Sequence, residues 1–178
     1  MKSPEVQQHQ IVVAGAGPAG AIAAAILKRK GHEVLILERQ RFPRFSIGES
    51  LLSHCLDFVE EAGMIDAVRA AGFQTKHGAA FAWGERYTDF DFRETFTKSF
   101  GSTYQVQRAD FDKVLADEAE RQGVTIRYEE EIVAVDFSGE QPLLSVRRLS
   151  DGHEYQVRCT FVLDASGYGR LLPRLLDL

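Results

Sequence analysis

The sequence predicts an α/β fold in which helices cover a parallel sheet and antiparallel β insertions interrupt the pattern. Two observations lead to this fold class. Short apolar runs at residues 11–14, 33–37 and 161–163 are typical of strands buried on both faces, and a helix-forming segment separates the first two. Residues 76–108 and 124–159 instead alternate apolar and polar side chains between turn signals, as antiparallel strands do.

The bulk composition fits one soluble domain with a core of its own. The chain has 178 residues, of which 44% are hydrophobic and 26% charged. The net charge of −5 argues against a nucleic-acid partner, whose binding surface would be basic. Two local clusters of Lys and Arg, at residues 27–31 and 38–44, are interpreted as solvated faces.

Cysteine, histidine and apolar patterns limit the cellular setting. Cys55 and Cys159 are the only cysteines, which predicts no disulfide framework and a reducing, cytoplasmic location. The five histidines lack metal-ligand spacing, so no metal site is expected. The uncharged stretch 11–27 carries three glycines and a proline near its start, so no membrane span is expected either.

The turn after the first apolar run has the spacing G-x-G-x-x-G. Gly15 permits a sharp turn, Gly17 lets the backbone approach a diphosphate, and Gly20 lets the following helix pack close to the strand. Pro18 suits the first helical turn, where its missing N–H costs nothing. These features predict a nucleotide-binding βαβ unit. A glycine-rich turn without a ligand is the alternative.

Glu38 follows the second apolar run, 18 residues beyond the last glycine of the motif. An acid at about this distance accepts hydrogen bonds from the ribose hydroxyls of a dinucleotide. A carboxylate there would also repel a 2′-phosphate, which disfavours NADP. The βαβ unit by itself does not decide between NAD and FAD.

The segment after Glu38 passes through an Arg/Phe/Pro-containing loop into a predicted helix at residues 51–62. Ser50 is the expected N-cap of this helix. Gly48 and Glu49 would then lie at a helix N-terminus, where free N–H groups favour an electron-rich ring edge or a diphosphate. An ordinary cap within a loop is the alternative.

Four separated stretches, "GAGPAG", "LERQRFPRFSIGESLL", "YQVQRADFDKVLADEAERQGV" and "FVLDASGYGRLLPR", resemble the flavin-dependent monooxygenase superfamily. This superfamily includes p-hydroxybenzoate hydroxylase and geranylgeranyl reductases, and the sequence is most similar to its flavin-dependent halogenases. The resemblance covers residues 11–174. It implies a Rossmann-like FAD-binding domain over residues 1–178, with a β-layer insertion at about 75–108. The family's later Gly-Asp motif is absent, so we expect the N-terminal part of a longer enzyme.

The resemblance also implies which residues bind FAD. The glycine loop would wrap the diphosphate, Glu38 and Arg39 would contact the adenosine, and residues 48–50 would line the approach of the flavin. An arginine at the start of a predicted helix at 109–122 and the "DASG" turn would complete the site. The implied cofactor-binding residues are Gly15, Gly17, Pro18, Ala19, Gly20, Glu38, Arg39, Gly48, Glu49, Ser50, Arg108, Asp164, Ala165 and Gly167.

Two of these residues can also be judged from the sequence alone. Asp164 ends an apolar strand at the carboxyl edge, where open α/β sheets bind ligands. In the hydroxylases the equivalent Asp is followed directly by Gly, whereas here Ala165 and Ser166 intervene, a form associated with halogenases and reductases. For Arg108, a surface ion pair with Asp110 or Asp112 is the alternative role.

Residues 76–108 carry much aromatic surface. The stretches "WGERYTDFDF" and "FTKSFGSTYQVQ" are predicted to form antiparallel hairpins or a meander. The resemblance places such a β-layer over the flavin. Six phenylalanines between Phe73 and Phe100, together with Trp83, are expected to lie mostly in a sheet core.

Lys76 is the predicted catalytic residue. Together with Gly78, Phe81 and Trp83 it forms the arrangement K-x-G-x-x-F-x-W, which resembles the context of the halogenase lysine. This role would require a partly desolvated amine with a lowered pKa in a dry channel. A lysine that protects a strand edge from aggregation is the alternative.

The resemblance implies a reaction and its partners. Reduced FAD and O₂ would form a flavin hydroperoxide, halide would attack it to give hypohalous acid, and Lys76 would deliver halogen to an electron-rich phenol- or pyrrole-like substrate, which a carrier protein could hold. A separate flavin reductase would supply the reduced FAD, because no NAD(P)H site is visible. An FAD-dependent monooxygenase or geranylgeranyl-reductase-like oxidoreductase and a non-catalytic nucleotide-binding module are the alternatives.

Overall fold

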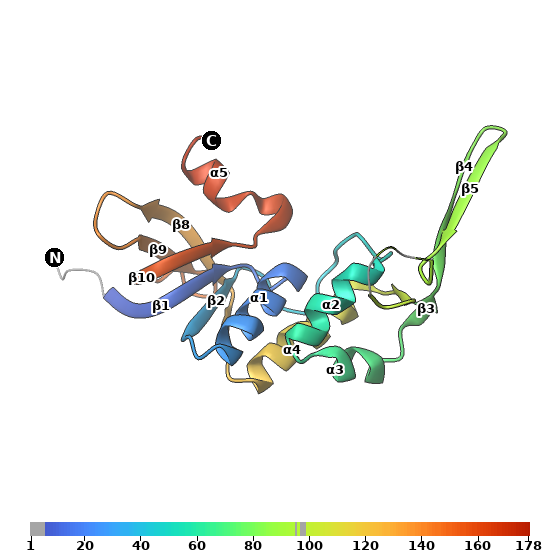
Figure 1. Ribbon diagram of the computed structural model, residues 1–178. Coiled ribbons are helices and arrows are strands. Elements are labelled where there is room, and N and C mark those ends of the chain that lie inside the picture. Colours follow the sequence, from blue (N-terminus) through green and yellow to red (C-terminus); the bar gives the residue numbers. More distant parts are fainter. Residues whose placement is uncertain (1–5, 95, 97–98) are drawn as a thin grey trace.

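A computed structural model describes residues 6–94, 96 and 99–178 of the chain, and Figure 1 shows how its elements are arranged. The main sheet has six strands in the order β7-β2-β1-β10-β9-β8. Neighbouring strands from β7 to β10 pair in parallel, whereas β9 pairs antiparallel with β10 on one side and with β8 on the other. In sheet order they are β7 (Thr125–Tyr128), β2 (Val34–Glu38), β1 (Val6–Ala14), β10 (Glu154–Asp164), β9 (Leu143–Arg148) and β8 (Glu130–Asp136).

Three parallel strands end together at the carboxyl edge of this sheet. Ala14 of β1 lies beside Leu37 of β2 on one side and beside Asp164 of β10 on the other. The Gly15 N–H donates to the Leu37 carbonyl at 2.9 Å, and the Ala165 N–H donates to the Ala14 carbonyl at 2.9 Å. The glycine-rich turn and the "DASG" turn are thereby adjacent, which confirms the predicted position of Asp164.

Helices cover one face of the parallel strands. Val13 and Ile36 point to this face and pack with Ala24 and Leu115 in a buried apolar cluster. In Figure 1, α1, α2 and α4 lie on the same side of β1 and β2. The helices are α1 (Pro18–Arg29), α2 (Ser53–Glu61), α3 (Ile65–Ala70) and α4 (Arg108–Arg121).

The opposite face is covered by the antiparallel strands and by the short helix α5 (Leu171–Leu175). Val12 and Leu35 point this way because side chains alternate along a strand. They pack with Val146 and Leu171 in a second buried cluster. The parallel strands are therefore covered by described residues on both faces, as their continuous apolar sequence predicts.

Most predicted elements of the main sheet are present, with shifted ends. Strand β1 extends the predicted run 11–14 back to Val6, and the predicted helix 109–122 is α4. Helix α1 ends at Arg29 with Lys30 as its C-cap, and Gly31 follows with a φ of 90°, the left-handed conformation that glycine commonly adopts just after a helix. The end of the alternating region predicted at 124–159 and the apolar run predicted at 161–163 form one strand, β10, which pairs with β9 in its first half and with β1 along most of its length.

The aromatic segment differs from the prediction. Strands β4 (Gly78–Trp83) and β5 (Arg86–Asp91) form the expected hairpin, but it is a separate two-stranded sheet that projects from the helices (Figure 1). Phe81 and Trp83 are 59% and 86% exposed. The expectation that these aromatics lie in a core is wrong, because no other described strand or helix covers the hairpin's faces. Phe92, at 4% exposed, is buried.

The second predicted hairpin, "FTKSFGSTYQVQ", is also replaced by a different pairing. Its described strand, β6 (Thr103–Gln105), pairs antiparallel with β3 (Gln74–Lys76), about 30 residues earlier in the chain. Residues 95, 97 and 98, on which part of this prediction falls, lie outside the described residues. The exchange brings Lys76 beside Thr103.

The structure also bears on membranes, metals and disulfides. None of the described helices combines the length and the apolar character needed to cross a bilayer. No three His, Cys, Asp or Glu side chains of the described chain converge as metal ligands. Cys55 and Cys159 are both free thiols.

Candidate cofactor-binding site and the Lys76 region

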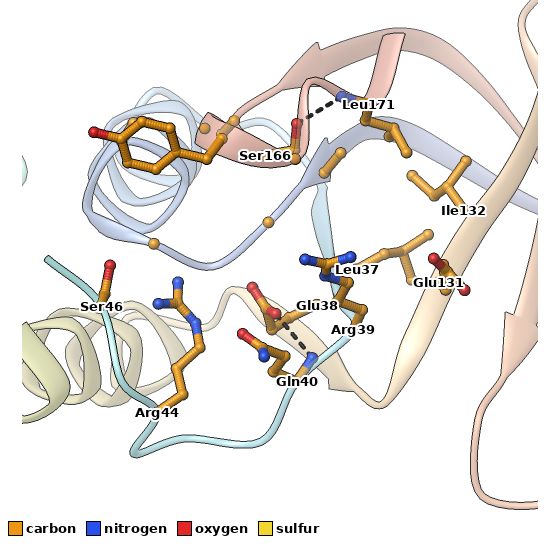
Figure 2. A pocket seen from close by; sticks show the side chains of 18 of the residues that line it. Leu37, Glu38, Arg39, Gln40, Arg44, Ser46, Glu131, Ile132, Ser166 and Leu171 are labelled. Atoms are coloured by element: carbon orange, nitrogen blue, oxygen red, sulfur yellow. Dashed lines mark hydrogen bonds between the residues drawn. The ribbon is translucent and has the colours of Figure 1, made fainter. Parts of the chain in front are cut away.

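A groove of about 500 Å³ lies at the carboxyl edge of β1, β2 and β10. Figure 2 shows the side chains that surround it, from the loop after β2, from β8 and from the turn before α5. Nine of the predicted cofactor residues line this groove, and Gly20, Gly48, Glu49, Ser50 and Asp164 do not. The nine are Gly15, Gly17, Pro18, Ala19, Glu38, Arg39, Arg108, Ala165 and Gly167.

The glycine-rich turn is built by close backbone packing. Gly15 has a φ of 99°, and a Cβ there would lie 2.9 Å from the Ala165 carbonyl oxygen. A Cβ at Gly20 would lie 1.9 Å from the Gly15 carbonyl oxygen, so the third glycine is required for packing even though it does not face the groove. Helix α1 starts at Pro18 without a side-chain cap. Its first turn can therefore direct backbone N–H groups at an anion.

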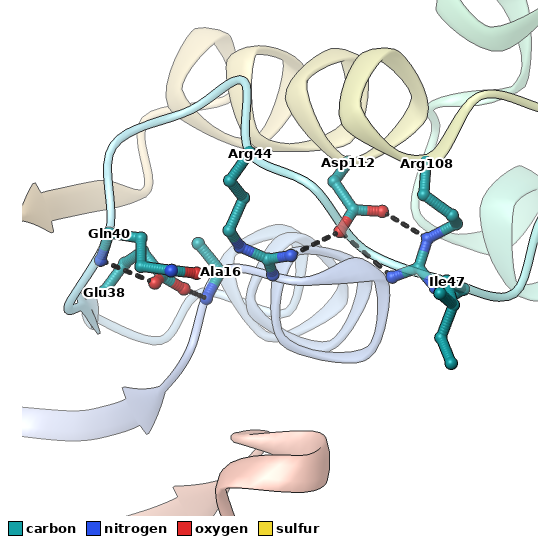
Figure 3. Close-up of polar contacts among 7 residues, drawn as sticks. All are labelled: Ala16, Glu38, Gln40, Arg44, Ile47, Arg108 and Asp112. Atoms are coloured by element: carbon teal, nitrogen blue, oxygen red, sulfur yellow. Dashed lines mark hydrogen bonds and ion pairs between the residues drawn. The ribbon is translucent and has the colours of Figure 1, made fainter.

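Glu38 holds the glycine-rich turn from the end of β2. Its side chain is 5% exposed; one carboxylate oxygen accepts the Ala16 N–H and the other accepts the Gln40 N–H, each at 2.9 Å (Figure 3). Each carboxylate oxygen has a further lone pair, so Glu38 can also accept from hydroxyls in the groove. The same group thus fixes the turn and faces the site.

Asp164 shapes the "DASG" turn from behind the groove wall. Its carboxylate accepts the Ser166 N–H at 2.9 Å and the Leu172 N–H at 2.8 Å, and Ser166 Oγ accepts the Leu171 N–H at 2.8 Å. Partial burial raises the pKa of Asp164, but hydrogen bonds from Ser166 and Leu172 outweigh it and hold the pKa below the usual value. The carboxylate therefore stays ionised and presents Ala165 and Gly167 to the groove.

Arg108 forms an ion pair with Asp112, one of the two partners considered from the sequence, but the pair is largely buried and does not lie on the surface. Its guanidinium makes two bonds to Asp112, at 2.7 and 3.0 Å, and Asp112 is 0% exposed (Figure 3). A third donor, Arg108 Nη1, bonds the Ile47 carbonyl at 2.5 Å. Arg108 thus joins the start of α4 to the loop after β2 while lining the groove.

Arg44 is a groove residue that the sequence patterns do not reveal. Its cluster is predicted to be a solvated face, yet its side chain is 18% exposed and lines the groove. Its Nη1 lies 3.4 Å from Asp112, and its Nη2 lies 3.4 Å from the place of a Cβ at Gly17. Arg44 Nε is buried without a hydrogen-bond partner among the described residues. No spacing rule identifies Arg44, because it lies in the long loop between β2 and α2.

Residues 48–50 do not form a helix N-terminus, so the predicted cap is wrong. Helix α2 begins at Ser53, with Leu52 as N-cap and no side-chain cap. Ser50 forms an isolated bridge with Gln105, and the Val106 N–H donates to the Glu49 carbonyl at 2.8 Å. Pairing with the chain around β6 keeps this segment extended. The Ser50 hydroxyl is therefore not needed for capping.

Lys76 ends β3 and is half-buried. Its Nζ donates to Ser50 Oγ at 2.5 Å and lies 5.4 Å from the centre of the Phe92 ring. Lys76 does not line the groove. The lysine is connected to the groove through residues 47–50, since Arg108 bonds Ile47 at one end of this segment and Lys76 bonds Ser50 at the other. The strand-edge alternative stays open, because β3 belongs to a two-stranded sheet.

Comparison with known proteins assigns the family. The FAD binding domain family matches residues 8–171, so the chain belongs to this FAD-binding family. A tryptophan 2-halogenase from Chondromyces crocatus is 37% identical over 164 residues, which are 92% of this chain and 31% of the relative. A 1H-pyrrole-2-carbonyl-[peptidyl-carrier protein] brominase from Pseudoalteromonas luteoviolacea is 32% identical over 96% of this chain and 40% of the relative.

A solved structure supports the same fold. A flavoprotein/dehydrogenase from Cytophaga hutchinsonii superposes with a TM-score of 0.91 and 44% identity, over 97% of this chain and 42% of that one. The predicted Rossmann-like fold with antiparallel insertions is confirmed. The chain spans less than half the length of each of these three proteins.

The groove fits FAD on its own chemistry. Two kinds of donor suit a diphosphate: the N–H groups at the start of α1, which has no side-chain cap, and the Nε of Arg44, which has no partner in the described part of the chain. The volume of about 500 Å³ is within the range of small-molecule and cofactor sites. Glu38 supplies acceptors for ribose hydroxyls next to these donors.

Proposed function

We propose that this chain is the FAD-binding part of a flavin-dependent halogenase that acts on an electron-rich aromatic substrate. The observation that carries the proposal is the hydrogen bond from Lys76 Nζ to Ser50 Oγ, at the end of the segment that Arg108 anchors to the cofactor groove. It gives the lysine a fixed place relative to the groove. Curated relatives that are halogenases support the assignment.

The residues of the groove would hold the cofactor in three parts. The glycine-rich turn and the first turn of α1, with Arg44 beside them, would bind the diphosphate. Glu38 would accept from the adenosine ribose, and Arg39 would lie beside the adenine. Arg108, Ala165 and Gly167 would line the path toward the flavin, and Arg108 joins this path to residues 47–50 through the Ile47 carbonyl.

Lys76 would carry the halogen. Reduced FAD, when bound, supplies hypohalous acid from O₂ and halide. The neutral amine of Lys76 can hold this acid by a hydrogen bond, or it can react with it to form an N–halogen bond with loss of water. Transfer to an aromatic carbon then forms the carbon–halogen bond and breaks the N–halogen bond, and the proton that this carbon loses goes to the nitrogen and restores the free amine. Ser50 Oγ accepts a Lys76 N–H and so orients the nitrogen for this transfer.

The partners follow from the same chemistry. We propose that a separate flavin reductase supplies reduced FAD. The similarity to a brominase whose substrate is a pyrrole on a peptidyl carrier protein supports a pyrrole- or phenol-like substrate, either free or carrier-tethered. Halide and O₂ are the proposed co-substrates.

Replacing Lys76 tests the proposal directly. In the intact enzyme, supplied with chemically reduced FAD, O₂ and bromide, Lys76→Ala should lower bromination of a phenol or pyrrole by at least about a hundredfold, the typical contribution of a positioned catalytic group. FAD affinity should not change, because Lys76 does not line the groove. Product mass spectrometry measures the first quantity and quenching of flavin fluorescence the second.

A matched control is Lys30→Ala, because Lys30 has an exposed side chain near the end of α1, 3.8 Å from Glu61. Its bromination rate should equal that of the wild type. Undiminished bromination by Lys76→Ala would leave the strand-edge role as the explanation for this lysine.

An FAD-dependent oxidoreductase without halide chemistry is the second candidate. The high structural similarity to a protein described as a flavoprotein/dehydrogenase favours it. The same assay separates the two candidates, because this enzyme would turn over its aromatic or other substrate without bromide and would incorporate no halogen.

A further inference from the structure

Asp112 is a buried acid beside a site for an anion. Its side chain is 0% exposed, and it does not line the groove, whereas Arg44 and Arg108 on either side of it do. A negative charge here weakens the attraction of the two arginines for a diphosphate. A buried carboxylate also has to be desolvated, which is costly unless it is fully paired. Its presence therefore needs a second reason.

The geometry supplies that reason. Asp112 accepts Nε and Nη2 of Arg108 in a two-bond fork, and its Oδ2 lies 3.4 Å from Arg44 Nη1 (Figure 3). These contacts leave particular donors free. Arg44 keeps Nε, which is buried and has no hydrogen-bond partner among the described residues, and Nη2, which lies beside Gly17. The remaining group of Arg108, Nη1, is not free, because it donates to the Ile47 carbonyl.

Without the carboxylate, two guanidinium groups next to each other would repel and turn apart. Arg44 lies in a loop, and its guanidinium carbon also lies 4.7 Å from the centre of the Phe42 ring. Asp112 is rigid by comparison, because it sits on α4 among the buried residues of that helix. The helix can thus hold a loop arginine in a fixed direction.

We propose that Asp112 is a positioning residue for the cofactor diphosphate. It directs the free Nε and Nη2 of Arg44 at the diphosphate beside Gly17, and it holds Arg108 against Ile47 at the flavin end of the groove. The inference rests on the proposed binding of FAD in this groove. On this proposal the Asp112 carboxylate strengthens FAD binding because it orients the two arginines, whereas its negative charge alone would weaken binding.

Asp112→Asn separates these two effects. The amide has nearly the same shape but keeps one acceptor oxygen, and its NH₂ group faces an arginine donor. If Asp112 positions the arginines, the dissociation constant for FAD rises about tenfold or more. The slope of the logarithm of that constant against the logarithm of salt concentration becomes shallower, since fewer fixed cations face the diphosphate. If Asp112 contributes only its charge, binding becomes tighter and the slope steeper.

The measurement is quenching of FAD fluorescence by the intact apoprotein from 50 mM to 500 mM salt, with ADP as a competing probe that carries the same diphosphate. Asp110→Asn is the matched control, because Asp110 is exposed two residues earlier on the same helix and does not line the groove. It should leave both affinities unchanged. Unchanged or tighter FAD binding by a folded Asp112→Asn protein overturns the inference.

A second set of variants covers the case in which Asp112→Asn does not fold. Arg44→Met and Arg108→Met should each weaken FAD binding, and the double variant should lose less than the product of the two single losses, because both arginines depend on one carboxylate. Strictly multiplicative losses would overturn the proposal. A wild-type protein that binds no FAD would instead refute the proposed cofactor site itself.

Discussion

The cofactor groove and the Lys76 region are built in opposite ways. Around the groove, the functional groups are fixed by backbone packing and buried carboxylates, with Glu38 at 5% and Asp112 at 0% exposed. Around Lys76, one side-chain hydrogen bond and two small sheets carry the arrangement, and Trp83, at the turn end of the β4–β5 hairpin, is 86% exposed. The first kind of site tolerates almost no added atoms. The second depends on single contacts that can be removed without disturbing the fold.

The largest effect is therefore expected at the glycine-rich turn. Gly20→Ala would place a methyl group 1.9 Å from the Gly15 carbonyl oxygen, so either α1 or the turn must move. Overpacking of this kind typically costs about 1–3 kcal/mol of stability. We expect that loss together with a weakening of FAD binding by more than about a hundredfold, since the moved turn also carries the N–H groups at the start of α1. Urea unfolding and flavin fluorescence measure the two quantities.

Gly139→Ala is the control for this substitution. A Cβ there would meet nothing closer than the Gln141 carbonyl oxygen at 3.8 Å, in an exposed loop between β8 and β9. Both stability and FAD affinity should stay at the wild-type level. If Gly20→Ala behaved like Gly139→Ala, close packing of α1 on the turn would not be what shapes the groove.

A smaller, more selective effect is expected at Ser50. Ser50→Ala removes the acceptor of the 2.5 Å bond from Lys76 Nζ but leaves the backbone pairing of Glu49 with Val106. The amine becomes less well oriented, and bromination should slow by about tenfold, the equivalent of about 1.4 kcal/mol. FAD affinity and stability should change little. Single-turnover bromination with reduced FAD measures the rate.

Ser150→Ala, in an exposed turn between β9 and β10, is the corresponding control and should brominate normally. A full rate in Ser50→Ala would mean that other groups orient the lysine. A parallel loss of FAD affinity would mean that Ser50 contacts the cofactor, as the family resemblance implies.

The same contrast explains what the sequence can predict. The glycine spacing, Glu38 and the "DASG" turn are recognisable because each meets a backbone requirement that few residue types satisfy. Parallel strands also bring their carboxyl ends to one edge. Gly15, Glu38 and Ala165 can therefore be placed together from the sequence alone, and all three line the groove.

Side-chain partnerships across long separations cannot be predicted in this way. Arg44 resembles any loop arginine until Asp112, 68 residues later, is seen to lie against it. Ser50 has the residue type of an N-cap, but pairing with Gln105 keeps its segment extended and delays the helix to Ser53. In both cases the deciding contact is with a residue that is remote in the sequence. The exposed hairpin aromatics are a third example, since alternation predicts a covered face without saying what covers it.

The smallest expected effect is a pH dependence on the covered side of the main sheet. Tyr155 is 2% exposed; its hydroxyl donates to Glu130 and accepts from Arg127 at 3.2 Å. Burial raises the pKa of Tyr155 to about 12, while an unfolded tyrosine titrates near 10. The native state therefore favours the neutral phenol. This stabilisation is complete below about pH 10 and is lost as the pH rises from about 10 to about 12.

Tyr155→Phe should lower the free energy of unfolding by about 1 kcal/mol at pH 7, the usual net worth of a buried hydrogen bond. The difference from wild type should shrink as the pH rises above about 10, because only the wild type has the phenol to ionise. Burial also raises the pKa of Cys159, to about 11. That thiol is present in both proteins and cancels in the difference. Urea unfolding at pH 7, 9, 10 and 11 measures how the difference in unfolding free energy depends on pH. A difference that stays constant to pH 11 would show that the pKa of Tyr155 is not raised in the folded protein.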